Sequence, residues 1–202
     1  MSREVHAPFC ERVGVRLPRA TLLVVLVDGH PRHNRLLGAV VKRLREEFAK
    51  LQVEINEEKT RMVDLRRGDS FGYLGFEFRR VRTHTGAWRP HYAPKLKKRT
   101  ALLQKLRAEF RRAVSQPVGR VIAAINPILR GWVNYFAAGH SSRCFTYVKT
   151  WVEKKVRRHL ERARTRRGFG WNRWSSQWIY QTLGLFNGYR LRRPTAKALP
   201  AG

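Results

Sequence analysis

Apolar residues recur every three or four positions between residues 95 and 160, which is the spacing of one face of an α-helix. The pattern predicts three amphipathic helices. Short connections between them predict a bundle, because each apolar stripe needs another one to cover it. The three stripes are Leu96, Leu103, Leu106, Phe110 and Val114; Val121, Ile125, Leu129, Trp132 and Phe136; and Phe145, Val148, Val152, Val156 and Leu160.

Prolines and serines predict where these helices begin and bend. Pro117 stands where the second helix can start. Pro127 lies inside that helix and is expected to kink or divide it near Asn126, because proline removes one backbone hydrogen bond. Ser141 or Ser142 is expected to cap the third helix.

The first 85 residues have a mixed pattern. The stretch RATLLVVLVDG, residues 19–29, predicts a buried strand that ends in a turn. Residues 35–51 predict an amphipathic helix, residues 53–55 and 61–65 short strands, and residues 71–81 a long alternating strand. The whole chain is therefore expected to have an α+β fold, in which a small β-rich part precedes the basic three-helix bundle and an aromatic-rich helical tail.

The charge balance points to a polyanionic partner. Lys and Arg number 43 against 14 Asp and Glu, which gives a formal net charge of +29. Residues 86–170 hold 21 of the basic and 3 of the acidic side chains. A generic basic surface is the alternative explanation.

Cysteines and apolar runs suggest the compartment. Cys10 and Cys144 lie far apart in the sequence, which fits a reducing environment without a disulfide framework. The run LLVVLV is far shorter than the ~20 residues that span a bilayer. We therefore expect a cytoplasmic protein that associates with nucleic acid and not with a membrane.

Aromatic residues crowd the C-terminal extension, residues 166–202. Trp171, Trp174 and Trp178 fall at helical spacing, which favours a face packed on the bundle. Stacking on nucleic-acid bases is the alternative.

Three ordered blocks resemble the C-terminal half of a bacterial group II intron reverse transcriptase, also called the intron-encoded maturase. They are NEEKTRMVDLRRGDSFGYLGFEF, INPILRGWVNYF and SSRCFTYVKTWVEKKVRRHL, and the resemblance covers about residues 19–193. It implies a partial polymerase palm at 19–85 and a maturase-specific domain, which is also the polymerase thumb, at 94–165. It also implies a primer-grip hairpin at Tyr73, Leu74, Gly75 and Phe76. Residues 1–18 form an unmatched leader.

The resemblance implies that the chain binds structured group II intron RNA, with an RNA–DNA duplex as a further candidate ligand. Recognition of shape rather than sequence is expected, because the major groove of A-form RNA is too deep and narrow to be read. The predicted contacts are the basic side chains Lys95, Lys97, Lys98, Arg99, Arg107, Arg111, Arg112, Lys154, Lys155, Arg157 and Arg158. About half of them are expected to be ordinary solvated charges.

Polymerase chemistry is not expected from this chain alone. In the family, a Tyr-Ala-Asp-Asp turn before the LVVLVDGH strand helps to hold two Mg²⁺ ions, for which carboxylate oxygens are the suitable ligands. Arg19, Ala20, Thr21 and Leu22 stand in its place, so we predict no catalytic residue and no cofactor. Mg²⁺ is expected only in a complete polymerase.

Other candidate sites are weak. Asp28 is expected to open a turn, and Lys59 to be a surface charge beside another turn. A zinc site from His6, Cys10, His30 and His33 is not expected, because no paired CxxC accompanies the H-x-x-H spacing. We predict no metal site.

The sequence thus predicts a truncated, non-catalytic maturase fragment that binds intron RNA and supports splicing. The first alternative is an RNA-directed DNA polymerase subunit completed in trans by a separately encoded N-terminal half. The second is the product of a pseudogene without function.

Overall fold

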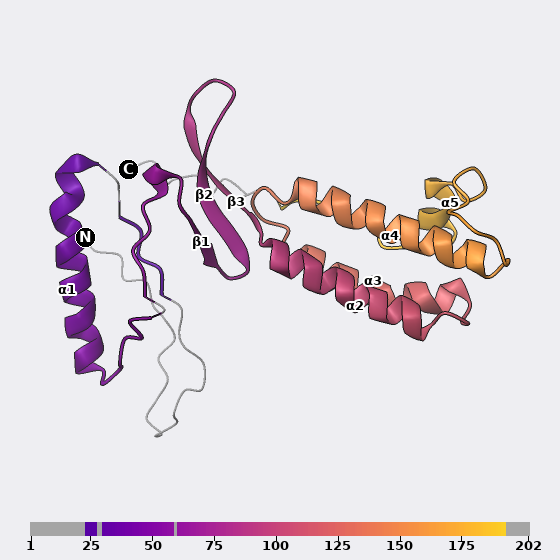
Figure 1. Cartoon of the computed structure of the whole chain (residues 1–202), viewed down its shortest axis with the longest axis horizontal. Coiled ribbons are helices and arrows are strands. Elements are labelled where there is room, and N and C mark those ends of the chain that lie inside the picture. The colour runs from indigo at the N-terminus through magenta and orange to yellow at the C-terminus, as the bar shows by residue number, and fades with distance from the viewer. Residues whose placement is uncertain (1–22, 28–29, 59, 193–202) are drawn as a thin grey trace, which may run out of the picture.

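The computed structural model describes residues 23–27, 30–58 and 60–192. In this part of the chain, an N-terminal helix and a three-stranded antiparallel sheet precede a set of packed helices (Figure 1). The mixed α+β class predicted from the sequence is confirmed. Arg19–Leu22, Asp28 and Lys59 lie outside the described residues.

The sheet is a meander of β1 (Ser70–Tyr73), β2 (Phe76–Arg82) and β3 (Trp88–Pro94). The single long strand predicted for residues 71–81 is wrong. The chain reverses at Leu74 and Gly75, whose φ angles are +45° and +81°, as a two-residue hairpin turn requires. Alternation alone did not reveal this turn. The strand β3 was not predicted, because Pro90 and Pro94 interrupt its pattern.

Three long helices share one apolar core, at the orange and pink end of Figure 1. They are α2 (Leu96–Arg112), α3 (Val118–Tyr135) and α4 (Ser142–Arg162). Most of the predicted stripes are buried, but Leu96 and Val114 at the two ends of the first stripe are exposed. The 3.6-residue period therefore identified the helices and their inner faces.

Pro127 was expected to kink or divide α3, and the helix is not divided, because it runs from Val118 to Tyr135 through the proline. Ile125 and Leu129 on either side of the proline are fully buried, so packing holds both halves in one helix. Ser141 precedes α4 as predicted, but its hydroxyl donates to the Ala138 carbonyl at 2.8 Å instead of capping the helix.

The N-terminal part has less buried surface. Helix α1 (Asn34–Lys50) follows a short 3-10 turn (Pro31–His33) and matches the predicted helix closely. Residues 23–27 form no strand, and Leu26 is 77% exposed, so the prediction of a buried strand is wrong for the described residues. Residues 53–55 and 61–65 form no strand either, and a 3-10 turn occupies Leu65–Arg67. Short alternating runs become strands only where a partner completes their hydrogen bonds.

The segment after α4 folds back over the helices. It contains the short helix α5 (Ser176–Gln181), and the following extended chain buries Leu185 against the core. Asn126 fixes this return, because its side chain donates to the Gly184 carbonyl and accepts from the Phe186 N–H, both at 2.9 Å. Trp174 and Trp178 pack on the core as predicted, whereas Trp171 is exposed. Only Trp178 of the three lies in a helix.

Within the described residues, no helix is both long and apolar enough to cross a bilayer.

Candidate nucleic-acid interface

A basic surface with interleaved aromatic rings lies where α2 meets α4. Along α4, the contributing residues are spaced by four, four, three and four positions, which places them on one side of the helix. We define the α2–α4 basic face as Arg99, Arg107 and Arg111 on α2 and Tyr147, Trp151, Lys155, Arg158 and Arg162 on α4.

Cation–π contacts join the two helices across this face. The Arg99 guanidinium lies 4.2 Å from the centre of the Tyr147 ring. The Trp151 ring has the Arg107 guanidinium at 5.7 Å and the Lys155 ammonium at 5.4 Å. Such contacts favour cations without neutralising them, so the charges stay available to an anion.

The electrostatics at Lys155 show that the charge is concentrated. Partial burial is the largest cause that lowers the pKa of the Lys155 ammonium from its usual value. The further causes are all repulsive, from the guanidinium groups of Arg107, Arg158, Arg162 and Arg111. A phosphate placed here would relieve this repulsion.

The acidic residues of the helical region are occupied elsewhere. Residues 86–192 contain three carboxylates, those of Glu109, Glu153 and Glu161. Glu109 pairs with Arg112. Glu153 accepts hydrogen bonds from the hydroxyls of Tyr180 at 2.6 Å and Ser176 at 3.1 Å, and Glu161 accepts one from the Trp174 indole at 2.8 Å. The α2–α4 basic face therefore has no carboxylate of its own.

Arg157 was predicted as an RNA contact, and its burial contradicts this. Its side chain is 2% exposed and donates to the Trp174 carbonyl at 2.7 Å and to the Ser176 hydroxyl at 2.9 Å. The segment after α4 covers the side of the helix on which Arg157 lies. The exposed side of α4 is the one that contributes to the α2–α4 basic face.

The other predicted contacts divide between several surfaces. Arg99, Arg107, Arg111, Lys155 and Arg158 come together on the α2–α4 basic face. Lys98 lies nine residues before Arg107, about two and a half helical turns, and so on the opposite side of α2. Lys97, Arg112 and Lys154 are exposed, while the Lys95 side chain lies against Gly72 of β1. Sequence reasoning missed Tyr147, Trp151 and Arg162, although their spacing with Lys155 was visible.

The predicted hairpin of Tyr73–Phe76 lies against the helices. The Gly75 carbonyl accepts a hydrogen bond from the Lys95 N–H, and the Leu74 carbonyl accepts one from the Tyr135 hydroxyl, both at 2.9 Å. The Phe76 ring meets Phe136 at 5.0 Å. These contacts hold the turn rigidly at the start of α2, while the Leu74 side chain is exposed.

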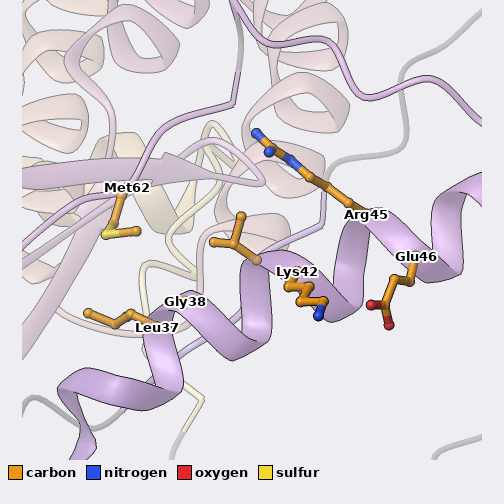
Figure 2. A pocket seen from close by; sticks show the side chains of 7 residues that line it. Leu37, Gly38, Lys42, Arg45, Glu46 and Met62 are labelled. Atoms are coloured by element: carbon orange, nitrogen blue, oxygen red, sulfur yellow. The ribbon is translucent and has the colours of Figure 1, made fainter.

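An open hollow beside α1 is lined by both apolar and charged side chains. Figure 2 shows Leu37, Lys42 and Glu46 on the helix and Met62 on the other side of the hollow. Within the described part of the chain, no three His, Cys, Asp or Glu residues gather to hold a metal ion.

A comparison with curated proteins gives no match for this chain. A comparison with protein families matches residues 99–179 to the group II intron, maturase-specific domain. The match covers all of α4 and α3, most of α2 and the beginning of α5. The α2–α4 basic face lies entirely inside it. Residues 99–179 are therefore similar to the group II intron, maturase-specific domain.

Proposed function

We propose that this protein binds structured group II intron RNA through the α2–α4 basic face and supports splicing of that RNA. One observation carries the proposal: the basic side chains of two helices converge on a face from which every nearby carboxylate is withdrawn. The maturase-specific domain supports the choice of RNA as the polyanion.

The form of the face favours recognition of phosphates. Guanidinium and ammonium groups on two rigid helices can bind successive phosphates of a duplex, and binding releases the counterions condensed on the RNA. The side chains project from helices that are too wide for the deep groove of A-form RNA, so shape and backbone contacts dominate.

A comparison of two triple variants tests the proposal. The first replaces Arg107, Arg111 and Lys155 on the face by Gln. The second replaces Lys98, Lys105 and Arg112, spaced by seven along the opposite side of α2, and removes the same charge. We expect the first variant to lose at least about tenfold more affinity for structured intron RNA than the second. Fluorescence anisotropy measures the affinity, and circular dichroism checks the folding.

Equal losses in the two variants would mean that the charge acts diffusely and that this face is no specific interface. If the first variant keeps its affinity for intron RNA, the α2–α4 basic face is likewise not the RNA interface.

A second candidate function is RNA-directed DNA polymerisation by a complex. A separately encoded N-terminal half would supply the metal-binding carboxylates in trans. The apolar side of α1 favours this candidate, because Leu36, Val41 and neighbouring Met62 are exposed, as a surface awaiting a partner would be. Primer extension on a primed RNA template tests it: the protein alone should give none, and activity that appears only with an added N-terminal half would support the complex.

A further inference from the structure

The loop between α4 and α5 presents a pair of aromatic rings on a basic surface. Phe169 and Trp171 lie with ring centres 6.1 Å apart, and Trp171 is 49% exposed. Nearby Trp174 and Trp178 are packed against the core and account for the apolar contacts of the segment. Trp171 is therefore a large apolar surface that folding leaves in contact with water.

A guanidinium lies near each of the two rings. The Arg157 guanidinium lies 4.5 Å from the centre of the Trp171 ring and is itself held by the Trp174 carbonyl and the Ser176 hydroxyl. The Arg158 guanidinium lies 6.0 Å from the Phe169 ring. A buried, hydrogen-bonded guanidinium under an indole restricts the ring, so that little entropy remains to be lost when a ligand stacks on it.

The loop is shaped by groups that keep it rigid. Gly170 has φ +57°, and a Cβ there would lie 2.4 Å from a Glu161 carboxylate oxygen. That carboxylate accepts hydrogen bonds from the Trp174 indole and from Arg173, and the Glu161 carbonyl accepts one from the Arg166 N–H at 3.0 Å. The aromatic pair thus projects from a fixed turn.

The surroundings of the pair select an anionic ligand. Arg162, Arg164, Arg166 and Arg167 are exposed in or beside the loop. Glu161, the nearest carboxylate, is buried and already paired. Aromatic rings among exposed arginines suit a nucleotide, which offers a base to stack and a phosphate to bind.

Arg158 connects this loop to the α2–α4 basic face, because it contacts Phe169 and also acts on Lys155. We infer that Trp171 and Phe169 form a stacking platform for one unpaired base of the RNA whose phosphates bind that face. The inference rests on the proposed function. It narrows the ligand of the protein to an RNA duplex with an unpaired nucleotide beside its paired region.

The test uses the full-length protein and two RNA hairpins that differ in one bulged nucleotide. The bulge carries 2-aminopurine, whose fluorescence changes when it stacks on an aromatic ring. We expect the wild type to change the signal of the bulged base and to bind the bulged hairpin about tenfold more tightly than the paired one. Trp171→Ala should abolish both effects and leave affinity for the paired hairpin unchanged, while Trp171→Phe should retain most of them.

Trp88→Ala is the matched control. Trp88 is also about half exposed and also carries an arginine, Arg80, at 5.1 Å over its ring, but it belongs to β3. The sheet that contains β3 and the helix α5 lie at opposite ends of the long helices (Figure 1). It should behave like the wild type. Unchanged affinity of Trp171→Ala for the paired hairpin shows that the variant is folded.

The outcomes separate the two proposals. If the wild type binds neither hairpin, the proposed RNA binding fails and the platform with it. If it binds both hairpins equally, or if Trp171→Ala retains the fluorescence change, only the stacking platform is overturned.

Discussion

Among single residues, the paired histidines at the junction of sheet and helices have the most unusual environment. The rings of His91 on β3 and His140 before α4 stack with centres 4.4 Å apart. The backbone N–H of His140 donates to the Tyr92 carbonyl at 2.8 Å, so the stacked rings lie at the junction between β3 and the helices. Burial is the largest cause that lowers the pKa of His91, followed by repulsion from His140, Arg79 and Arg143. Each of these neighbours disfavours a protonated His91.

We expect this arrangement to make stability depend on pH. The pKa of His91 is lowered from its usual 6.5, so between the lowered value and 6.5 the unfolded chain binds more protons than the folded one. The stabilisation is complete above about pH 6.5 and is lost as the pH falls through the lowered value. Thermal melting at several pH values measures it. His91→Gln should flatten the decrease in melting temperature between pH 7 and pH 5, and an equally steep decrease in this variant would rule out His91 as the cause.

At the scale of elements, the junction depends on one glycine before α4. Gly139 has φ +67°, and a Cβ there would lie 2.6 Å from the Tyr92 carbonyl oxygen. No side chain fits without moving β3 away from the helices. Gly131, four residues before the end of α3, has nothing near its missing Cβ and is an ordinary helical position.

The same substitution should therefore have opposite effects at the two glycines. Gly139→Ala should destabilise the protein by about 1–3 kcal/mol through backbone strain and collision with Tyr92. Gly131→Ala should stabilise it by about 0.5–1 kcal/mol, because alanine is the better helix former. Urea titration followed by circular dichroism gives both values. If Gly139→Ala leaves the free energy of unfolding unchanged, β3 can move away from the helices at little energetic cost.

Trp132 on α3 links the main helical core to the smaller cluster around Val133, Phe136 and Phe145. Trp132→Ala should cost about 3–5 kcal/mol, since it leaves a cavity between the two clusters. Trp88→Ala, at the exposed beginning of β3, should cost less than about 0.5 kcal/mol. Chemical denaturation of the two variants compares them, and a similar small loss for both would mean that Trp132 packs loosely.

At the scale of the whole molecule, packing and charge are unevenly distributed. The buried apolar residues belong to the helical region and the loops beside it, whereas the described residues of α1 include none. The same helical region holds most of the excess positive charge. The helical region therefore holds both the apolar core of the described residues and most of the positive charge.

This distribution predicts how RNA affinity responds to salt. Each phosphate contact that is lost should lower the slope of log affinity against log salt concentration by about 0.7–0.9. The triple variant of Arg107, Arg111 and Lys155 should therefore lower the slope by about 2–3. Affinity measured at several salt concentrations gives the slope. An unchanged slope would show that these three side chains do not contact phosphates.

The sequence by itself determined the α+β class, the three long helices with most of their inner faces, and the similarity of residues 99–179 to a maturase-specific domain. These properties depend on patterns along the chain. A 3.6-residue period shows which face of a helix is buried wherever that helix packs, and ordered motifs show a similarity to a family without coordinates.

Only the tertiary structure decided which charged and aromatic residues reach the surface. Arg157 and Arg158 are neighbours in the sequence, yet the segment with Trp174 and Ser176 covers the first and leaves the second exposed. Trp171 and Trp174 have equivalent spacing, but only Trp174 packs on the core. Periodicity tells on which side of an element a residue lies, whereas its burial depends on which distant segment folds over that side.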